Sequence, residues 1–257
     1  MLRWLLNNLN SALLIVLITG GAVGLAFALE RFQRHRMRGR QPESSEMLGM
    51  TVEFVGIAYA ILIGFVIVSL WDTQGAATDI VSDEAAALSD IGTLTRGMAP
   101  ADSAAIRAEI IDYGETMVDE EFEMLRDGEF SARAQADTEA LFDSIIGADV
   151  SSPIYVTMQD KAIDTYKDFS DLRTKRLQIA NDKLAGELWL LVLVSSLALI
   201  LLVAAFEGEG RWDMWASLII SGTVGLVLFA MVALSYPFSG DLAVTPGPFA
   251  EVVRALG

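Results

Sequence analysis

The sequence predicts an all-α integral membrane protein, in which four transmembrane helices in a 2+2 arrangement flank a helical acidic extramembrane domain. Three observations predict this fold. The chain of 257 residues is 53% hydrophobic with a mean hydropathy of +0.45, which is unusually apolar for a soluble protein. Its apolar residues gather in four blocks of about 20 residues, long enough as helices to span a hydrocarbon core of roughly 30 Å. Its acidic residues concentrate between the second and third blocks.

The four apolar blocks predict transmembrane helices at residues 12–29, 54–71, 188–206 and 215–235. All five tryptophans lie at or near block ends, as in an interfacial aromatic belt: Trp4, Trp71, Trp189, Trp212 and Trp215. The first block also resembles a signal peptide, but the arginines that follow it oppose translocation. Its Gly20 and Gly24 have the spacing that lets another helix approach closely, although glycine is common in membrane helices.

The segment between the second and third blocks is acidic and has a helical pattern. Asp72–Lys183 contains 24 acidic and 10 basic residues, so it carries −14 of the net charge of −16. Ser152-Pro153 is a typical helix start, and after Tyr155 most apolar residues recur every three or four positions. Neither proline nor glycine interrupts residues 154–185, so we expect this helix to continue into the third transmembrane helix.

These patterns divide the chain into four expected parts. They are two transmembrane helices with a basic loop, the acidic domain, two further transmembrane helices and a C-terminal tail, at residues 1–71, 72–184, 185–240 and 241–257.

The distribution of basic residues predicts an orientation in a membrane, most simply the bacterial inner membrane. Residues 31–40 contain five arginines, and the positive-inside rule places such a loop in the cytoplasm. Residues 72–184 are then extracytoplasmic. Basic residues near the third helix oppose this orientation, but long loops weigh less in the rule: Arg173, Lys175, Arg176 and Lys183.

Composition and motifs argue against several functions. The chain has no cysteine, and its one histidine, His35, lies among the arginines, so we expect no enzyme, no cofactor and no metal site. The acidic balance argues against a nucleic-acid partner. One acidic run lacks the spacing of a calcium-binding loop, and we interpret it as a solvated helix face: Asp119, Glu120, Glu121 and Glu123.

Three polar residues in or beside the apolar blocks are candidates for a pore or gating role. Glu53 precedes the second block, Ser69 lies within it, and Glu187 precedes the third block. An unpaired ionisable group in hydrocarbon costs a few kcal/mol, although this cost falls near the interface. Two further arginines, Arg173 and Arg176, are expected to pair with Glu84 or other acids.

The stretch after the fourth block is Tyr236-Pro-Phe-Ser-Gly-Asp-Leu-Ala-Val-Thr-Pro246. It resembles the close of the bestrophin-like domain family of bacterial and plant membrane proteins. Other residues match that family's pattern in order along residues 50–250: Tyr59, Gly64, Trp71, Glu84, Tyr113, Arg173 and Arg176. Within the closing stretch, we expect Pro237 and Gly240 to end the fourth helix and turn the chain, and Phe238 to be buried.

The resemblance implies a membrane protein with a helical insert, related to bestrophins, which are pentameric anion channels. It therefore implies a homo-oligomer in a lipid bilayer. Two functions stay open. One is an oligomeric ion channel for an unknown ion. The other is a non-conducting scaffold or sensor whose acidic domain binds a protein partner or a cation. The acidic domain would repel anions from a nearby pore mouth.

Overall fold

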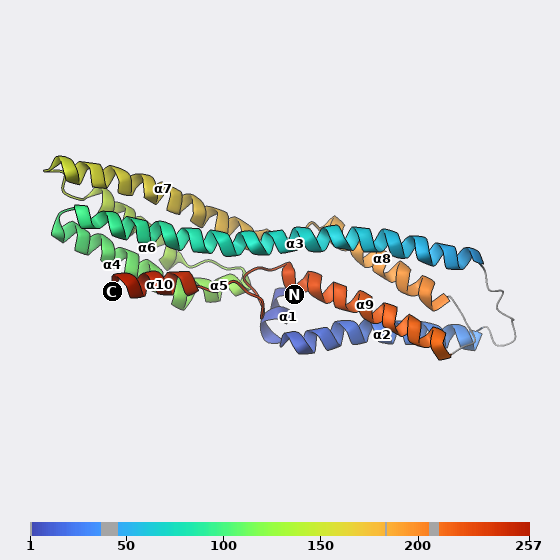
Figure 1. Cartoon of the computed structure of the whole chain (residues 1–257). Coiled ribbons are helices and arrows are strands. Elements are labelled where there is room, and N and C mark those ends of the chain that lie inside the picture. The colour runs from blue at the N-terminus through green and yellow to red at the C-terminus, as the bar shows by residue number, and fades with distance from the viewer. Residues whose placement is uncertain (1, 37–45, 183, 206–210) are drawn as a thin grey trace. The chain divides into compact units, whose positions relative to one another are not determined.

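The computed structural model describes residues 2–36, 46–182, 184–205 and 211–257 (Figure 1). These residues form helices and connecting turns and contain no strand, which confirms the predicted all-α class. The chain divides into two compact units, each made of two segments. The first is Met1–Asp72 with Lys183–Ser235, and the second is Thr73–Asp182 with Tyr236–Gly257.

The first unit contains α1 (Leu2–Asn8), α2 (Ser11–Arg36), the beginning of α3 (Glu46–Leu94), α8 (Gly186–Ala205) and α9 (Arg211–Leu234). Four helical stretches each contain an apolar segment long enough to cross a membrane: Ser11–Phe32, Gly49–Gly97, Pro153–Ala205 and Met214–Leu234. They include the four predicted blocks, apart from residue 206, which lies outside the described residues, and Ser235, which follows the end of α9. Residues 37–45, which include the last four residues of the predicted basic loop at 31–40, also lie outside them.

The close helix contact in the first unit depends on a glycine of α9. A Cβ atom added to Gly225 would lie 2.6 Å from the Cα atom of Thr19, so α2 and α9 approach closely there. The sequence also offered Gly20 and Gly24 as candidates for a close approach, although glycine is common in membrane helices. A Cβ atom added to either would meet no described atom within 4 Å, so neither serves this purpose within the chain.

Helix α7 (Pro153–Asn181) ends before α8 begins, which corrects the expectation of one continuous helix. Asp182 has extended backbone angles, φ −66° and ψ 138°, and its N–H donates to the carbonyl oxygen of Gln178. The side chains of asparagine and aspartate compete for backbone hydrogen bonds, which makes the Asn181-Asp182 pair a natural helix end.

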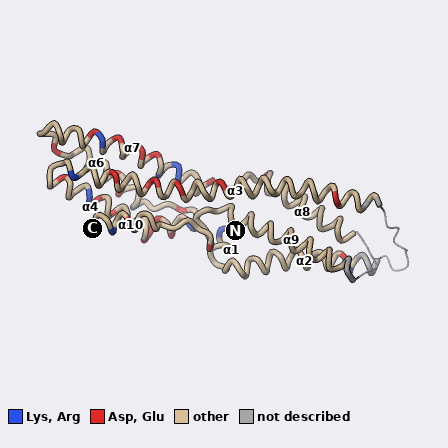
Figure 2. Tube along the Cα trace, viewed as in Figure 1, with Lys and Arg blue, Asp and Glu red and all other residues tan. Residues whose placement is uncertain are grey.

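The second unit contains the rest of α3 and the helices α4 (Pro100–Thr116), α6 (Ala132–Ile146), α7 and α10 (Gly247–Leu256). Three shorter elements join them: η1 (Thr95–Gly97), the π-helix η2 (Met117–Glu121) and α5 (Phe122–Asp127). Charged side chains are frequent on these helices and rare on the helices of the first unit (Figure 2). The core is aliphatic and aromatic, with fully buried Leu88, Ile91, Ile106, Ile110, Leu141 and Phe169.

The segment after α9 turns as predicted. Gly240 adopts φ 79°, which is unfavourable for residues with a side chain, and the N–H of Val244 donates to the carbonyl oxygen of Pro237 at 2.8 Å. Phe238 is buried with its ring 5.9 Å from that of Phe122. Helical structure resumes at Gly247.

Replacing Gly225 with alanine should destabilise the first unit, because the new methyl group meets the backbone of α2. Such overpacking costs about 1–3 kcal/mol. Gly24→Ala on α2 is the matched control, since its methyl group meets nothing within 4 Å. Thermal unfolding in detergent should therefore occur at a lower temperature for Gly225→Ala only. Equal melting of the two variants would show that the α2–α9 contact is absent.

Candidate functional site

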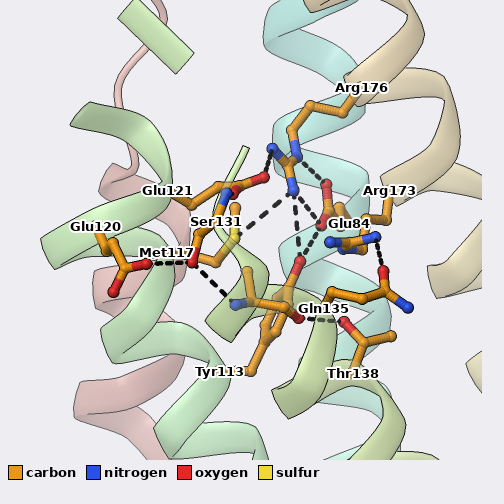
Figure 3. A network of polar contacts seen from close by, with 11 residues as sticks. Glu84, Tyr113, Met117, Glu120, Glu121, Ser131, Gln135, Thr138, Arg173 and Arg176 are labelled. Carbon is orange, nitrogen blue, oxygen red and sulfur yellow. Dashed lines mark hydrogen bonds and ion pairs between the residues drawn. The ribbon is translucent and has the colours of Figure 1, made fainter. Parts of the chain in front are cut away.

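The guanidinium group of Arg176 is the centre of a buried polar network in the second unit (Figure 3). Arg176 lies on α7 and is fully buried. Its Nε donates to Oε2 of Glu84 on α3 at 2.7 Å, and its Nη1 donates to Oε1 of Glu121 at 3.1 Å. Arginine stays protonated in proteins, so one fixed positive charge faces two buried carboxyl groups.

Tyr113 of α4 is a further hydrogen-bond donor to Glu84. Its hydroxyl donates to Oε1 of Glu84 at 2.6 Å, and Nη2 of Arg176 lies 3.3 Å from the same oxygen. Burial raises the pKa of Tyr113 well above its ordinary value, and the charge of Glu84 raises it further, against a smaller opposite effect of Arg176. Tyr113 therefore keeps its proton and remains a hydrogen-bond donor.

Glu121 reaches the network from the end of η2. Its Oε2 accepts a hydrogen bond from the backbone N–H of Ser131 at 2.6 Å. The Ser131 hydroxyl accepts from the N–H of Ala134, which caps α6, and also bonds to the carboxylate of Glu120. The loop before α6 therefore fixes Glu121 in place.

The burial of Glu121 corrects the interpretation of the acidic run as a solvated helix face. Its side chain is fully buried, whereas that of Glu123 is 77% exposed. A π-helix has a wider turn than an α-helix, so it shifts the residues that follow relative to a regular helical pattern. Sequence periodicity gave no signal for this shift.

Other contacts extend the network around Arg176. Arg173, one turn earlier on α7, donates from Nη1 to Oε1 of Gln135 on α6 at 2.9 Å. The Phe122 ring lies 5.9 Å from Cζ of Arg176, within range of a cation–π contact. Polar contacts thus join α3, α4, η2, α6 and α7.

The charges of Arg176, Glu84 and Glu121 are buried and matched by hydrogen bonds. In contrast, Nε of Arg173 is buried without a partner among the described residues. This arrangement suits a structural role in holding the helices together rather than a reaction site.

The pore and gating candidates lie elsewhere. Glu53, Ser69 and Glu187 are all exposed, the first two on α3 and the third in the first turn of α8. The structure therefore places none of them in the Arg176 network.

The residues that carry the family resemblance fall into three groups. Glu84, Tyr113, Arg173 and Arg176 come together in the network, while Pro237, Phe238 and Gly240 form the turn after α9. Tyr59 is buried in the first unit and accepts a hydrogen bond from Ser196 of α8 at 3.1 Å. Gly64 and Trp71 are exposed on α3.

Exposed residues of α3 recur at helical spacing in each unit, and we call these residues the α3 ridge. In the first unit we define it by Ile57, Ile61 and Val68, which are 56%, 57% and 59% exposed. Phe54 and Phe65, which are 74% and 75% exposed, fall in the same helical sector. In the second unit it consists of the exposed residues Asp79, Asp83 and Asp90. Within each set, successive residues are four or seven positions apart. Asp72 lies between the sets, four positions after Val68 and seven before Asp79. The buried residues of α3 in the first unit lie on another face: Tyr59, Ile63, Val66 and Leu70.

Comparisons with known proteins agree with this architecture. A family model described as "Bestrophin-like domain" matches residues 16–249, and no curated protein sequence matches the chain. Two solved structures of a bacterial bestrophin homologue from Klebsiella pneumoniae are similar. One, carrying an isoleucine-to-threonine mutation, is 14% identical with a TM-score of 0.74 and covers 94% of this chain and 98% of its own. Another, carrying a leucine-to-threonine mutation, is 13% identical with a TM-score of 0.72, covering 94% and 97%. At such identities the similarity establishes the fold.

Replacing Glu84 with alanine should destabilise the protein strongly, because Arg176 loses a buried partner. Breaking a buried ion pair costs about 3–5 kcal/mol. The neighbouring Asp83 is exposed, and Asp83→Ala should change the free energy of unfolding by no more than about 0.5 kcal/mol. Urea unfolding of both variants in detergent measures the difference. Similar unfolding midpoints would contradict the buried pairing.

Tyr113 should make the protein sensitive to alkali. Its pKa is raised by folding, so its contribution to stability is complete below the unfolded pKa of about 10 and is lost as pH rises from there towards the folded value. Tyr113→Phe should be less stable near neutral pH, because the bond to Glu84 is missing, but its melting temperature should fall less steeply above about pH 10. Parallel curves for the two proteins would refute this role.

Proposed function

Because the chain belongs to the bestrophin-like family, whose model covers residues 16–249, we propose that it is a membrane ion channel formed by several copies of the chain. The α3 ridge is the observation that carries this proposal. It faces a water-filled pore, with its apolar residues at a constriction and its aspartates in a vestibule. The partners are the lipid bilayer and further copies of the same chain.

The spacing of the ridge supports a pore-facing role. From Ile57 to Asp90 its residues recur every four or seven positions, so they stay within a sector of about 80° along a single helix. The acidic part requires water, because an unpaired carboxylate is costly in an apolar environment. The apolar part continues the same face. Charged rings beside a hydrophobic constriction are a recurring design of ion pores.

Glu53 supports the same orientation of α3. It lies one helical turn before Ile57 and is exposed. Facing lipid, a carboxylate costs up to about 2.5–3.5 kcal/mol at the bilayer centre and less near the interface. Facing water in a pore, it avoids this cost. Ser69, next to Val68, and Glu187 remain candidates for contact with ions or for gating.

The charge of the ridge favours cations. In a ring of copies, Asp72, Asp79, Asp83 and Asp90 would each contribute one carboxylate per chain to the vestibule. A vestibule lined by one sign of charge concentrates counter-ions and repels ions of the same sign. We therefore propose a cation-preferring channel.

Neutralising the ridge should reduce this preference. In planar bilayers with a KCl gradient, the reversal potential of the purified protein should be displaced from zero towards the equilibrium potential of potassium. The triple variant Asp79→Asn/Asp83→Asn/Asp90→Asn should bring the reversal potential closer to zero. A matched triple variant changes three exposed acids away from the ridge: Glu115→Gln, Asp119→Asn and Glu129→Gln. It should leave the potential unchanged. Equal shifts in both variants would contradict a ridge-lined pore. Absence of current would favour the non-conducting scaffold or sensor.

We also propose that residues 31–40 are cytoplasmic and that the acidic domain, residues 72–184, lies outside the bacterial inner membrane. The arginines of the first loop support this orientation. The test uses single cysteines at Arg36 and Glu129, since the chain has none of its own. Glu129 is exposed, and it is preferable to Gly128, whose φ is 82°. In intact cells an impermeant thiol reagent should label position 129 only. Labelling of position 36 only would reverse the orientation.

A further inference from the structure

Two open grooves run beside α3 in the second unit. The first, of about 430 Å³, lies between α3 and α10 and is lined by small residues of α3 (Ser82, Ala85, Ala86 and Ser89) together with Glu251 of α10. The second, of about 680 Å³, is lined by Ile80 of α3 and by the exposed edge of α7, including Lys175 and Gln178.

The grooves lie on opposite flanks of the ridge. Ile80 and Ser82 are two residues apart on a helix, so their side chains point about 160° apart. Asp79 and Asp83 point between them, into the exposed sector. The two grooves are neighbours along α3, because Ile80 lies about 3 Å of helical rise before Ser82.

Each groove is lined by a charged side chain, and these two have opposite signs; Asp182 also lines the second groove. Glu251 is exposed on α10 and Lys175 is exposed on α7. Among the described residues, neither side chain makes an ion pair within the chain. Lys167, two turns earlier on the same face of α7, differs because it pairs with Asp164 at 2.8 Å.

We propose that the α7 edge of one copy docks into the α3–α10 groove of the next copy, with Lys175 meeting Glu251. Two different surfaces meet in such a contact, and repeating it produces a closed ring or an open filament. Such a contact closes into a ring where the rotation between successive copies divides a full turn without rise, and the proposed channel requires that closure. The small residues of α3 leave room for the neighbouring α7. This inference rests on the proposed function, because it places the ridge towards the ring axis.

Cysteine cross-linking tests the contact directly, because the chain contains no cysteine. Lys175→Cys/Glu251→Cys, oxidised in native membranes, should give a ladder of linked chains on a non-reducing gel, ending at the ring size. Each single variant should remain monomeric on the gel. Lys167→Cys/Glu251→Cys is the matched control, since position 167 is about 12 Å further along α7, and it should link poorly. Dimers from Lys175→Cys alone would indicate a two-fold contact and overturn the proposal, as would equal ladders from both double variants.

A charge exchange tests the same pair without oxidation. Lys175→Glu should reduce the fraction of protein that elutes as a ring in mild detergent, and Lys175→Glu/Glu251→Lys should restore it. Lys167→Glu should not reduce it. Loss without restoration would overturn the pairing. Conductance is measured separately: a ladder without current would overturn the proposed channel and keep the interface, whereas current without a ladder would overturn the interface and keep the channel.

Discussion

The second unit depends on the burial of one positive charge. An arginine removed from water is tolerated only where hydrogen-bonded carboxylates surround it, and Arg176 finds them on two different elements, α3 and η2. Tyr113 and the backbone of Ser131 then hold those carboxylates. Because this arrangement satisfies all of these groups together, it selects one register of α3 against α7. An apolar core of equal volume would tolerate neighbouring registers, so the network contributes specificity more than net stability.

Helix α3 binds Arg176 through a carboxylate on its buried face and presents the α3 ridge on another face. Its buried row continues at helical spacing through Val66, Leu70, Ala77 and Val81 to Glu84, so the carboxylate that binds Arg176 occupies a core position. The α3 ridge lies away from this row and is exposed. The polar network therefore fixes the rotation of α3 about its own axis within the second unit. The proposed pore and the proposed interface both depend on that rotation, although neither contains a residue of the network.

Sequence periodicity predicted the features that follow from regular helices and bilayer thickness. The transmembrane blocks were predictable because hydrocarbon demands about 20 apolar residues. The sequence led us to expect that Arg173 and Arg176 pair with Glu84 or other acids. Arg176 does so, whereas Arg173 donates to the side-chain amide oxygen of Gln135. Three features required the structure. Close approach at Gly225 rather than Gly20 depends on which helix faces which, the end of α7 at Asp182 depends on local hydrogen bonding, and the role of Glu121 depends on an irregular turn.

The π-helix has a consequence for how this sequence can change. A π-turn holds one residue more than an α-turn, so if the same residues formed a regular α-helix, those after η2 would rotate by about 100° relative to those before it. Glu121 would then turn away from Arg176, although the run would still contain the same acids. Changes that favour a regular α-turn in η2 are therefore more constrained than changes of its exposed residues. Asp119 can be exchanged for another polar residue at little cost, but the wide turn between Tyr113 and Glu121 must be kept.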